Sequence, residues 1–188
     1  MSLQGHIILT ARSQLGVTET GGPDGHSGNI VPYWDWWKTC THENGQGQSW
    51  CACFISWVFA QNKSSNLIAA KNPYGFIYCP DLENYGIKNK RLITDKKKGL
   101  PGDLILFDWD GAGIADHVEV IQKNLSATSP FYLTIGANTS GEGVLGSQKN
   151  GGGVYERHRH IDSTIRGIYH PPYPMKLTSL VSTADIAA

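Results

Sequence analysis

The sequence predicts an α+β domain in which N-terminal helices pack on a C-terminal antiparallel β-sheet of about five strands. Helical spacing of apolar residues is confined to residues 1–61, whereas short apolar runs separated by Gly, Ser and Asn fill residues 101–170. The chain has 188 residues, 40% hydrophobic and 17% charged, which suits one globular domain. We expect the domain to span residues 1–173, followed by a linker or disordered tail over 174–188, which is rich in Ser, Thr and Ala.

Two amphipathic helices are predicted. The first spans residues 3–16, where Gly16 ends the apolar period. The second spans residues 50–61, with Ser49 as its expected N-cap and a broad apolar face that includes Phe54 and Val58. The pattern is weak over residues 62–99, which predicts loops and short helical pieces there.

An aromatic cluster lies between these helices. Four aromatic residues in five positions are too many for one face of a helix, so some of them must line a surface or a groove, where aromatic planes stack on sugars and apolar groups. For any one of them, a partly buried helix packed on the core is an equally good interpretation. The residues are Tyr33, Trp34, Trp36 and Trp37.

The second half of the chain predicts strands. Apolar or alternating runs of four to seven residues follow one another, and loops of Gly, Ser and Asn separate them. We expect strands over residues 104–107, 116–122, 132–138, 154–160 and 165–170. Helices before an antiparallel sheet give the α+β class.

Charge and composition exclude several classes of protein. Lys plus Arg and Asp plus Glu number 16 each, and this neutral balance argues against a protein that grips nucleic acid or an anionic membrane. No segment is apolar enough to insert into a bilayer, and the N-terminus lacks a secretory signal, so we expect synthesis in a host cytoplasm and action on its substrate after release. Four cysteines are too few for a disulfide scaffold. We expect a monomer.

Cys51 is the candidate nucleophile. It stands in the first turn of the second predicted helix, where unpaired backbone N–H groups favour a thiolate, the form that attacks a carbonyl carbon. Backbone amides, or the side chain of Gln46 or Gln48, are candidates for holding the oxyanion. A buried cysteine that only fills space is the competing interpretation, and it suits Cys53 better.

His117 is the candidate general base. It opens the strand over residues 116–122 and follows the glycine-rich loop over residues 110–113, which places the imidazole at a sheet edge beside a loop. The remaining histidines lie in a helix, in loops or on a strand where they alternate with arginines.

Two segments contain residue types that can bind a metal ion. Cys40, His42, Cys51 and Cys53 contain zinc-ligand types, but Cys51 and Cys53 are too closely spaced and would point to different sides of a helix. The loop Asp24–Asn29 has oxygen ligands suited to calcium but lacks alternating acidic residues. We therefore expect no cofactor, and calcium at Asp24–Asn29 is the one exception that the sequence suggests.

Several segments resemble one known family. Ser49–Trp57 (SWCACFISW), Pro101–Leu104 (PGDL), Phe107–Trp109 (FDW) and Asp116–Val118 (DHV) occur in the order of the cysteine, histidine-dependent amidohydrolase/peptidase (CHAP) domain. The resemblance runs from the first helix to about Tyr173. It implies a papain-like fold and a Cys–His thiol mechanism on peptidoglycan, with Cys51 and His117 at the family's catalytic positions.

One position departs from the family pattern. The family often has Glu where this chain has Gly136, and that glutamate orients the histidine. Asn138 is the preferred substitute, because asparagine has this role in papain-type enzymes. Glu119 is the alternative, because residues two apart on a strand share a face and Glu119 therefore lies on the side of His117.

The resemblance implies cleavage of an amide bond in the stem peptide, the cross-bridge or the muramoyl–alanine link of bacterial peptidoglycan. A phage endolysin catalytic domain is the expected setting. The alternatives are a catalytically impaired wall-binding module and a secreted or delivered bacterial toxin of the same fold. Aromatic residues are expected to contact the substrate, namely Trp36, Trp37, Trp50 and Trp109.

Overall fold

The computed structural model describes residues 1–22, 28–141, 147 and 150–174, and it has the predicted α+β architecture. Helices come first in the chain, and strands follow. The helices are α1 (Leu3–Arg12), α2 (Pro32–Thr41), α3 (Cys51–Gln61), the short 3₁₀ helix η1 (Ser65–Ile68) and α4 (Cys79–Lys88). The strands are β1 (Leu92–Ile93), β2 (Leu104–Phe107), β3 (His117–Asn124), β4 (Phe131–Thr139), β5 (Gly153–His160) and β6 (Ile165–Tyr169).

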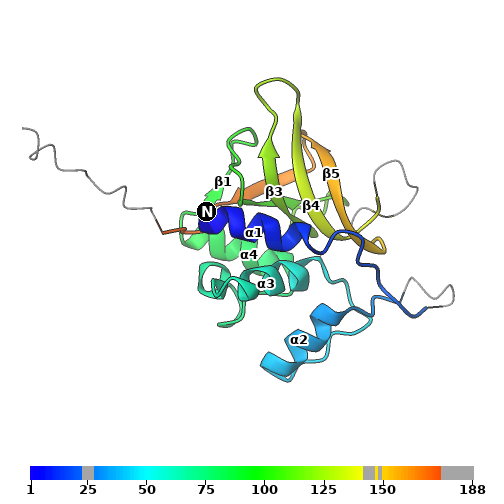
Figure 1. Cartoon of the computed structure of the whole chain (residues 1–188). Helices are drawn as coiled ribbons and strands as arrows, with labels where there is room; N and C mark the ends of the chain where they lie inside the picture. The colour runs from blue at the N-terminus through cyan, green and yellow to red at the C-terminus, as the bar shows by residue number, and fades with distance from the viewer. Residues whose placement is uncertain (23–27, 142–146, 148–149, 175–188) are drawn as a thin grey trace, which may run out of the picture.

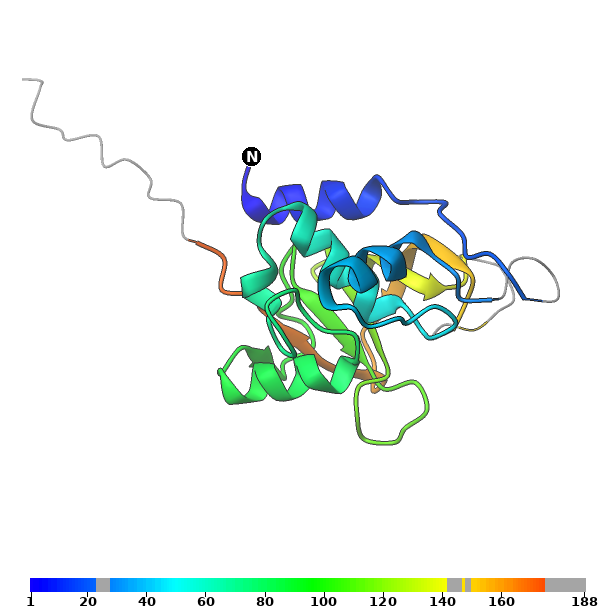
Figure 2. The same ribbon diagram turned by 90° about the horizontal axis from the view of Figure 1, so that it is seen from below.

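The strands form one antiparallel sheet in the order β1-β6-β2-β3-β4-β5. Helices α1 and α3 pack on its central strands β3 and β4, and α4 packs on β6 and β1 (Figure 1). Helix α2 lies beyond α3 on the side away from the sheet, and from below the helices lie in front of the strands (Figure 2). The sheet thus supports a layer of helices in which α3 is central.

Apolar side chains are buried on both faces of the sheet. The face under the helices carries Leu104, Leu106, Val118, Val120 and Ile135, which join the main core. The opposite face carries a smaller apolar cluster, formed by Ile105, Phe107, Ile121, Tyr132, Ile165 and Ile168. Because side chains alternate along a strand, residues adjacent in sequence lie in different apolar clusters, on opposite faces of the sheet.

The structure corrects several expected boundaries. The sheet has six strands instead of about five, because the two-residue strand β1 is too short to show a period. Helix α4 lies where the pattern predicted loops and short helical pieces, since Leu82 is the one large apolar residue on its buried side, beside Cys79, Pro80, Glu83 and Gly86. Helix α1 ends at Arg12 and not at residue 16.

Two further expectations concern the ends of the helices and of the chain. Ser49 does not cap α3, because Trp50 holds the N-cap position and no side chain bonds to the helix end. The predicted tail at 174–188 lies outside the described residues except for Pro174. None of the described helices combines the length and apolar character needed to cross a bilayer.

Candidate active site

Cys51 is the first residue of α3 and lines a cavity of about 330 Å³. The residue is 3% exposed, so its sulfur is reached only through this cavity. Its position at the helix N-terminus places it beside the unpaired N–H groups of the first turn, as the sequence predicted. The same cavity is bordered by the loop before β3 and by the start of α4.

His117 is the first residue of β3 and has no exposed surface. It lies opposite Phe107 of β2, and the two ring centroids are 6.1 Å apart. Burial alone would lower the pKa of His117, but the negative charge of Cys51 and the neighbouring Glu119 carboxylate together raise this pKa to about 9. The structure therefore brings together the two residues that the sequence selected, although 66 positions separate them along the chain.

The same interactions act on the sulfur. A hydrogen bond with Cys79 lowers the pKa of the Cys51 thiol, burial opposes this, and His117 and the backbone N–H of Val118 lower it further. The result is a pKa well below that of an ordinary thiol. Cys51 and His117 can therefore exist as a thiolate–imidazolium pair up to a pH near 9.

Glu119 is the hydrogen-bond partner of the imidazole on its other side. Its Oε1 lies 3.1 Å from His117 Nε2, as the shared strand face predicted for this alternative. The carboxylate also accepts a hydrogen bond of 2.6 Å from Thr134 and a two-pronged contact from Arg159, whose Nε lies 2.9 Å from Oε2. Burial would raise the pKa of Glu119, but Arg159 and His117 hold it far below its usual range.

Arg159 is itself enclosed. It is 4% exposed, donates a 3.1 Å hydrogen bond to Thr139 Oγ1 and lies over the rings of Phe107 and Trp109 at 5.6 and 5.3 Å. These rings stack with centroids 4.4 Å apart. Arg159 is not among the predicted site residues, although Arg and His alternate along β5. The alternation was the usable signal, since it places Arg159 on one face and His160 on the other.

Gly136 accounts for the departure from the family pattern. It lies directly opposite Glu119 on β4, and a Cβ at this position would stand 2.2 Å from Glu119 Oε1. The Glu119 side chain thus fills the space that a side chain at position 136 would need. The carboxylate is present, but it comes from the neighbouring strand.

Asn138 does not make the hydrogen bond to His117 Nε2, which corrects the preferred assignment. Its side-chain Nδ2 donates to Asn150 Oδ1 at 3.4 Å, and its backbone has a φ of 56° at an irregularity in the β4–β5 pairing. The left-handed conformation suits asparagine better than most residues. The contact between Glu119 and the imidazole thus lies within β3, whereas the left-handed backbone at Asn138 accompanies a side-chain bond to Asn150.

Replacement of Gly136 by Ala is expected to displace the Glu119 carboxylate and to lower the free energy of unfolding by about 1–3 kcal/mol. Thermal unfolding and hydrolysis of cell walls should both report the change. Gly167→Ala on β6 is the matched control, because its Cβ would meet only the flexible Leu92 side chain at 3.1 Å. A Gly136→Ala variant as stable and as active as the parent would contradict this account of Gly136.

The two oxyanion candidates differ in their surroundings. Gln46 donates from Nε2 to Val31 O at 3.1 Å and to Asp35 Oδ1 at 3.0 Å, and its Oε1 accepts from Val31 N. These bonds hold the Gln46 amide against the start of α2, which argues against its role as an oxyanion donor. Gln48 is exposed and borders a second cavity of about 530 Å³ that shares Ser49, Ile77 and Tyr78 with the first.

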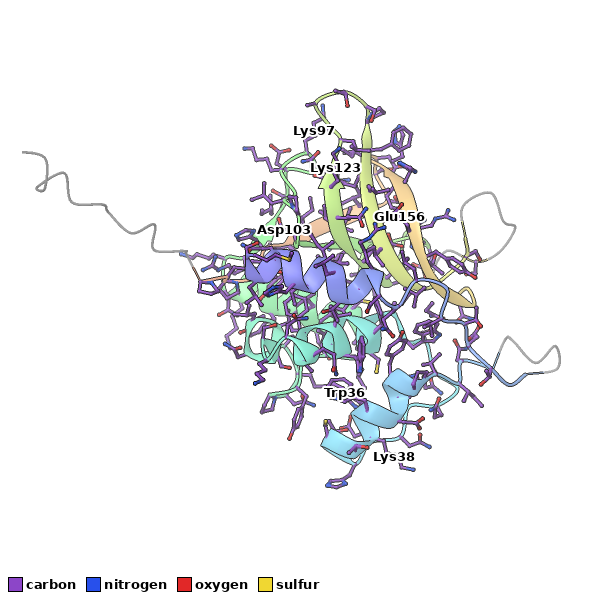
Figure 3. The ribbon with its side chains drawn as sticks, in the orientation of Figure 1. Trp36, Lys38, Lys97, Asp103, Lys123 and Glu156 are labelled. Carbon is purple, nitrogen blue, oxygen red and sulfur yellow. The ribbon has the colours of Figure 1, made fainter. Side chains whose placement is uncertain are left out.

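The four candidate substrate aromatics do not border the Cys51 cavity. Trp37 and Trp50 have no exposed surface and belong to the core, and Trp109 stacks on Phe107 and covers Arg159. Trp36 is half-buried on α2, the helix farthest from the sheet in Figure 3. Their expected role as an exposed substrate surface is therefore wrong for Trp37 and Trp50. Trp37 nevertheless borders the second cavity from within the core.

The sequence analysis also missed Cys79. Its sulfur lies 3.8 Å from that of Cys51, and it borders the same cavity from the start of α4. Burial and the neighbouring sulfur raise the pKa of the Cys79 thiol well above its usual value. Nothing in the local sequence pointed to this pair, because Cys79 lies 28 residues from Cys51 and only the packing of α4 brings the two sulfurs together.

The described residues contain one group whose ligand atoms are close enough for a metal, formed by Asp108, Asp110 and Asp116. Each accepts hydrogen bonds from backbone N–H groups of the same loop. The four candidate zinc ligands at positions 40, 42, 51 and 53 do not form such a group. Cys53 Sγ bonds to Tyr33 O at 3.3 Å, and Cys51 pairs with Cys79. Most of the suggested calcium loop Asp24–Asn29 lies outside the described residues.

Comparison with known proteins agrees with this site. The model of the CHAP domain matches residues 42–138, just over half of the chain, and this span contains Cys51, His117 and Glu119. Neither the curated proteins nor the solved structures gave a match. The chain therefore belongs to the CHAP-domain family of peptidoglycan amidases and peptidases.

Proposed function

We propose that this chain hydrolyses an amide bond of peptidoglycan through a covalent intermediate on Cys51. The observation that carries the proposal is the pairing of Cys51, which lines a cavity, with the buried His117 behind it. The family supplies the substrate class, and the site supplies the chemistry. No metal ion or organic cofactor is needed for this route.

The reaction would begin from the ion pair. The proton of the Cys51 thiol resides on His117, and the thiolate attacks the carbonyl carbon of the scissile amide. Backbone N–H groups of the first turn of α3 stabilise the oxyanion. His117 then protonates the leaving amine, so the C–N bond breaks and a thioester remains. Water, deprotonated by His117, cleaves the thioester and restores Cys51.

Glu119 would act on this cycle through the imidazole. Its hydrogen bond to Nε2 fixes the orientation of the ring, so that the other nitrogen, Nδ1, is the one that exchanges the proton with the sulfur. Arg159 keeps Glu119 ionised, and an ionised Glu119 stabilises the imidazolium. The Glu119 carboxylate takes the place of the one that is missing at Gly136, and this favours an active enzyme over a catalytically impaired wall-binding module.

The scissile bond is proposed to lie in the stem peptide, the cross-bridge or the muramoyl–alanine link. We propose a phage endolysin as the setting, with a secreted or delivered bacterial enzyme of the same fold as the alternative. Mass spectrometry of digested peptidoglycan distinguishes the bonds. Cleavage of the muramoyl–alanine link releases peptide-free glycan, whereas the other two cuts shorten peptides that remain attached to glycan.

The test is clearing of a cell-wall suspension, followed by this product analysis. The untreated protein should clear the suspension and generate one new amine for each bond cut. Protein alkylated with iodoacetamide should do neither, because the thiolate is the nucleophile. Equal clearing by the untreated and the alkylated protein would rule out a thiol mechanism.

A further inference from the structure

A second thiol touches the proposed nucleophile. The sulfurs of Cys51 and Cys79 are 3.8 Å apart, and the two residues begin helices α3 and α4. They are 3% and 4% exposed, and both border the cavity of about 330 Å³. Neither is part of a disulfide. A substrate that reaches Cys51 through this cavity must therefore pass beside Cys79.

We propose that Cys79 is a further catalytic residue, whose thiol donates a hydrogen bond to the sulfur of Cys51 and holds it as the attacking thiolate. This inference rests on the proposed role of Cys51 as nucleophile. Cys79 neither gains nor loses a proton in the cycle. Its S–H bond remains intact, and only the charge on its acceptor changes.

Charges on either side of the pair decide which sulfur donates. His117 lies on the side of Cys51, and its positive charge favours a thiolate there. Asp116 acts on Cys79, and its negative charge opposes a second thiolate. The two helix starts also differ, because the first turn of α4 lacks an N–H at Pro80 and carries Asp81, whereas the first turn of α3 has no acidic residue and therefore favours an anion more. The proton of the pair therefore stays on Cys79.

Titratable groups from three elements face the pair among the described residues. His117 comes from β3, Asp110 and Asp116 come from the loop before it, and Cys53 lies on the same helix as Cys51. Of these, Cys53 is turned toward the carbonyl of Tyr33, and its own pKa is raised by burial and by the charge of Cys51. Cys79 is the described side chain whose hydrogen-bond contact with the Cys51 sulfur has a defined geometry, with the two sulfurs 3.8 Å apart.

A donor at this position has a distinctive kinetic consequence. It increases the fraction of thiolate at low pH, but it also lowers the nucleophilicity of each thiolate, since nucleophilicity falls with pKa. Loss of the donor should slow Cys51 in acid and leave it equal or faster in alkali. A residue that only fills space would not produce this crossing.

The experiment measures the rate at which iodoacetamide alkylates Cys51 as a function of pH, with each cysteine resolved by mass spectrometry of its peptide. Cys79→Ala removes the donor and should raise the midpoint of the Cys51 profile by about one pH unit. Cys79→Ser retains an O–H donor and should shift it less. Cys53→Ala is the control. It removes a cysteine from the same helix whose thiol bonds to Tyr33 O, so the midpoint should stay unchanged.

An unchanged midpoint in Cys79→Ala would overturn the proposal, as would an equal shift in Cys53→Ala. If thermal unfolding shows that Cys79→Ala is not folded, Cys79→Val replaces it in the comparison with Cys79→Ser, because valine fills the space without supplying a donor. The assay contains no peptidoglycan. A shifted midpoint in a protein that cuts no cell wall would therefore contradict the proposed function and leave the role of Cys79 intact.

Discussion

Cys51→Ala is expected to lower the rate of peptidoglycan hydrolysis by at least about 10⁴-fold, because the remaining thiol of the cavity, Cys79, has a raised pKa and is a poor nucleophile. The substitution removes one buried sulfur at the start of α3 and leaves His117, Glu119 and Arg159 in place. The variant should therefore fold and should still bind cell walls. Clearing of a wall suspension and sedimentation of the protein with intact walls measure the two properties separately.

Two controls sharpen this prediction. Cys40→Ala removes a half-exposed thiol at the end of α2 and should leave the rate unchanged. Cys51→Ser retains a hydroxyl, but its pKa is far too high for it to form an anion beside His117, so its rate should also fall to background. Clearing by Cys51→Ala at the parental rate would remove the basis of the proposed function.

Glu119→Ala should have the second largest effect, and it should act on both stability and rate. It leaves the Arg159 guanidinium buried without its carboxylate, and such a change costs about 3–5 kcal/mol. His117 loses its partner at Nε2, so the ring can adopt the wrong tautomer. Thermal unfolding should show a much lower midpoint, and the hydrolysis rate of the folded fraction should fall.

Glu119→Gln separates the two effects. It keeps the volume and one acceptor for Arg159, but it removes the negative charge that stabilises the imidazolium. Since the folded pKa of Glu119 lies far below the unfolded value of about 4.3, its stabilising contribution is complete above that pH and is lost on acidification. The Gln variant should therefore lose less stability than the parent when the pH falls from neutral to acid.

A compensating double variant tests whether the carboxylate can be moved between strands. Gly136 lies opposite Glu119, so Glu119→Ala combined with Gly136→Glu places a carboxylate on β4 in the same space. The pair of changes should recover part of the rate that Glu119→Ala loses. Gly136→Glu alone should be destabilising, because two carboxylates would compete for Arg159. If the double variant hydrolyses peptidoglycan no faster than Glu119→Ala, a carboxylate on β4 cannot replace the one on β3.

Local features of the sequence determined the elements of the fold and the two central residues of the candidate site. The apolar period identified α1 and α3, and apolar or alternating runs separated by turn residues identified β2 to β6. Cys51 at a helix start and His117 at a strand start followed from the same periods. So did the shared face of His117 and Glu119, because side chains repeat every two residues along a strand.

Tertiary structure alone decided what lies beside these residues. The register of β3 and β4 placed Gly136 opposite Glu119, and the register of β5 brought Arg159 to the same carboxylate. The packing of α4 brought Cys79 to Cys51. Periodicity within a segment shows which face a residue occupies but not which residue of another segment it meets. That choice is made by strand register and helix packing, which depend on the whole core.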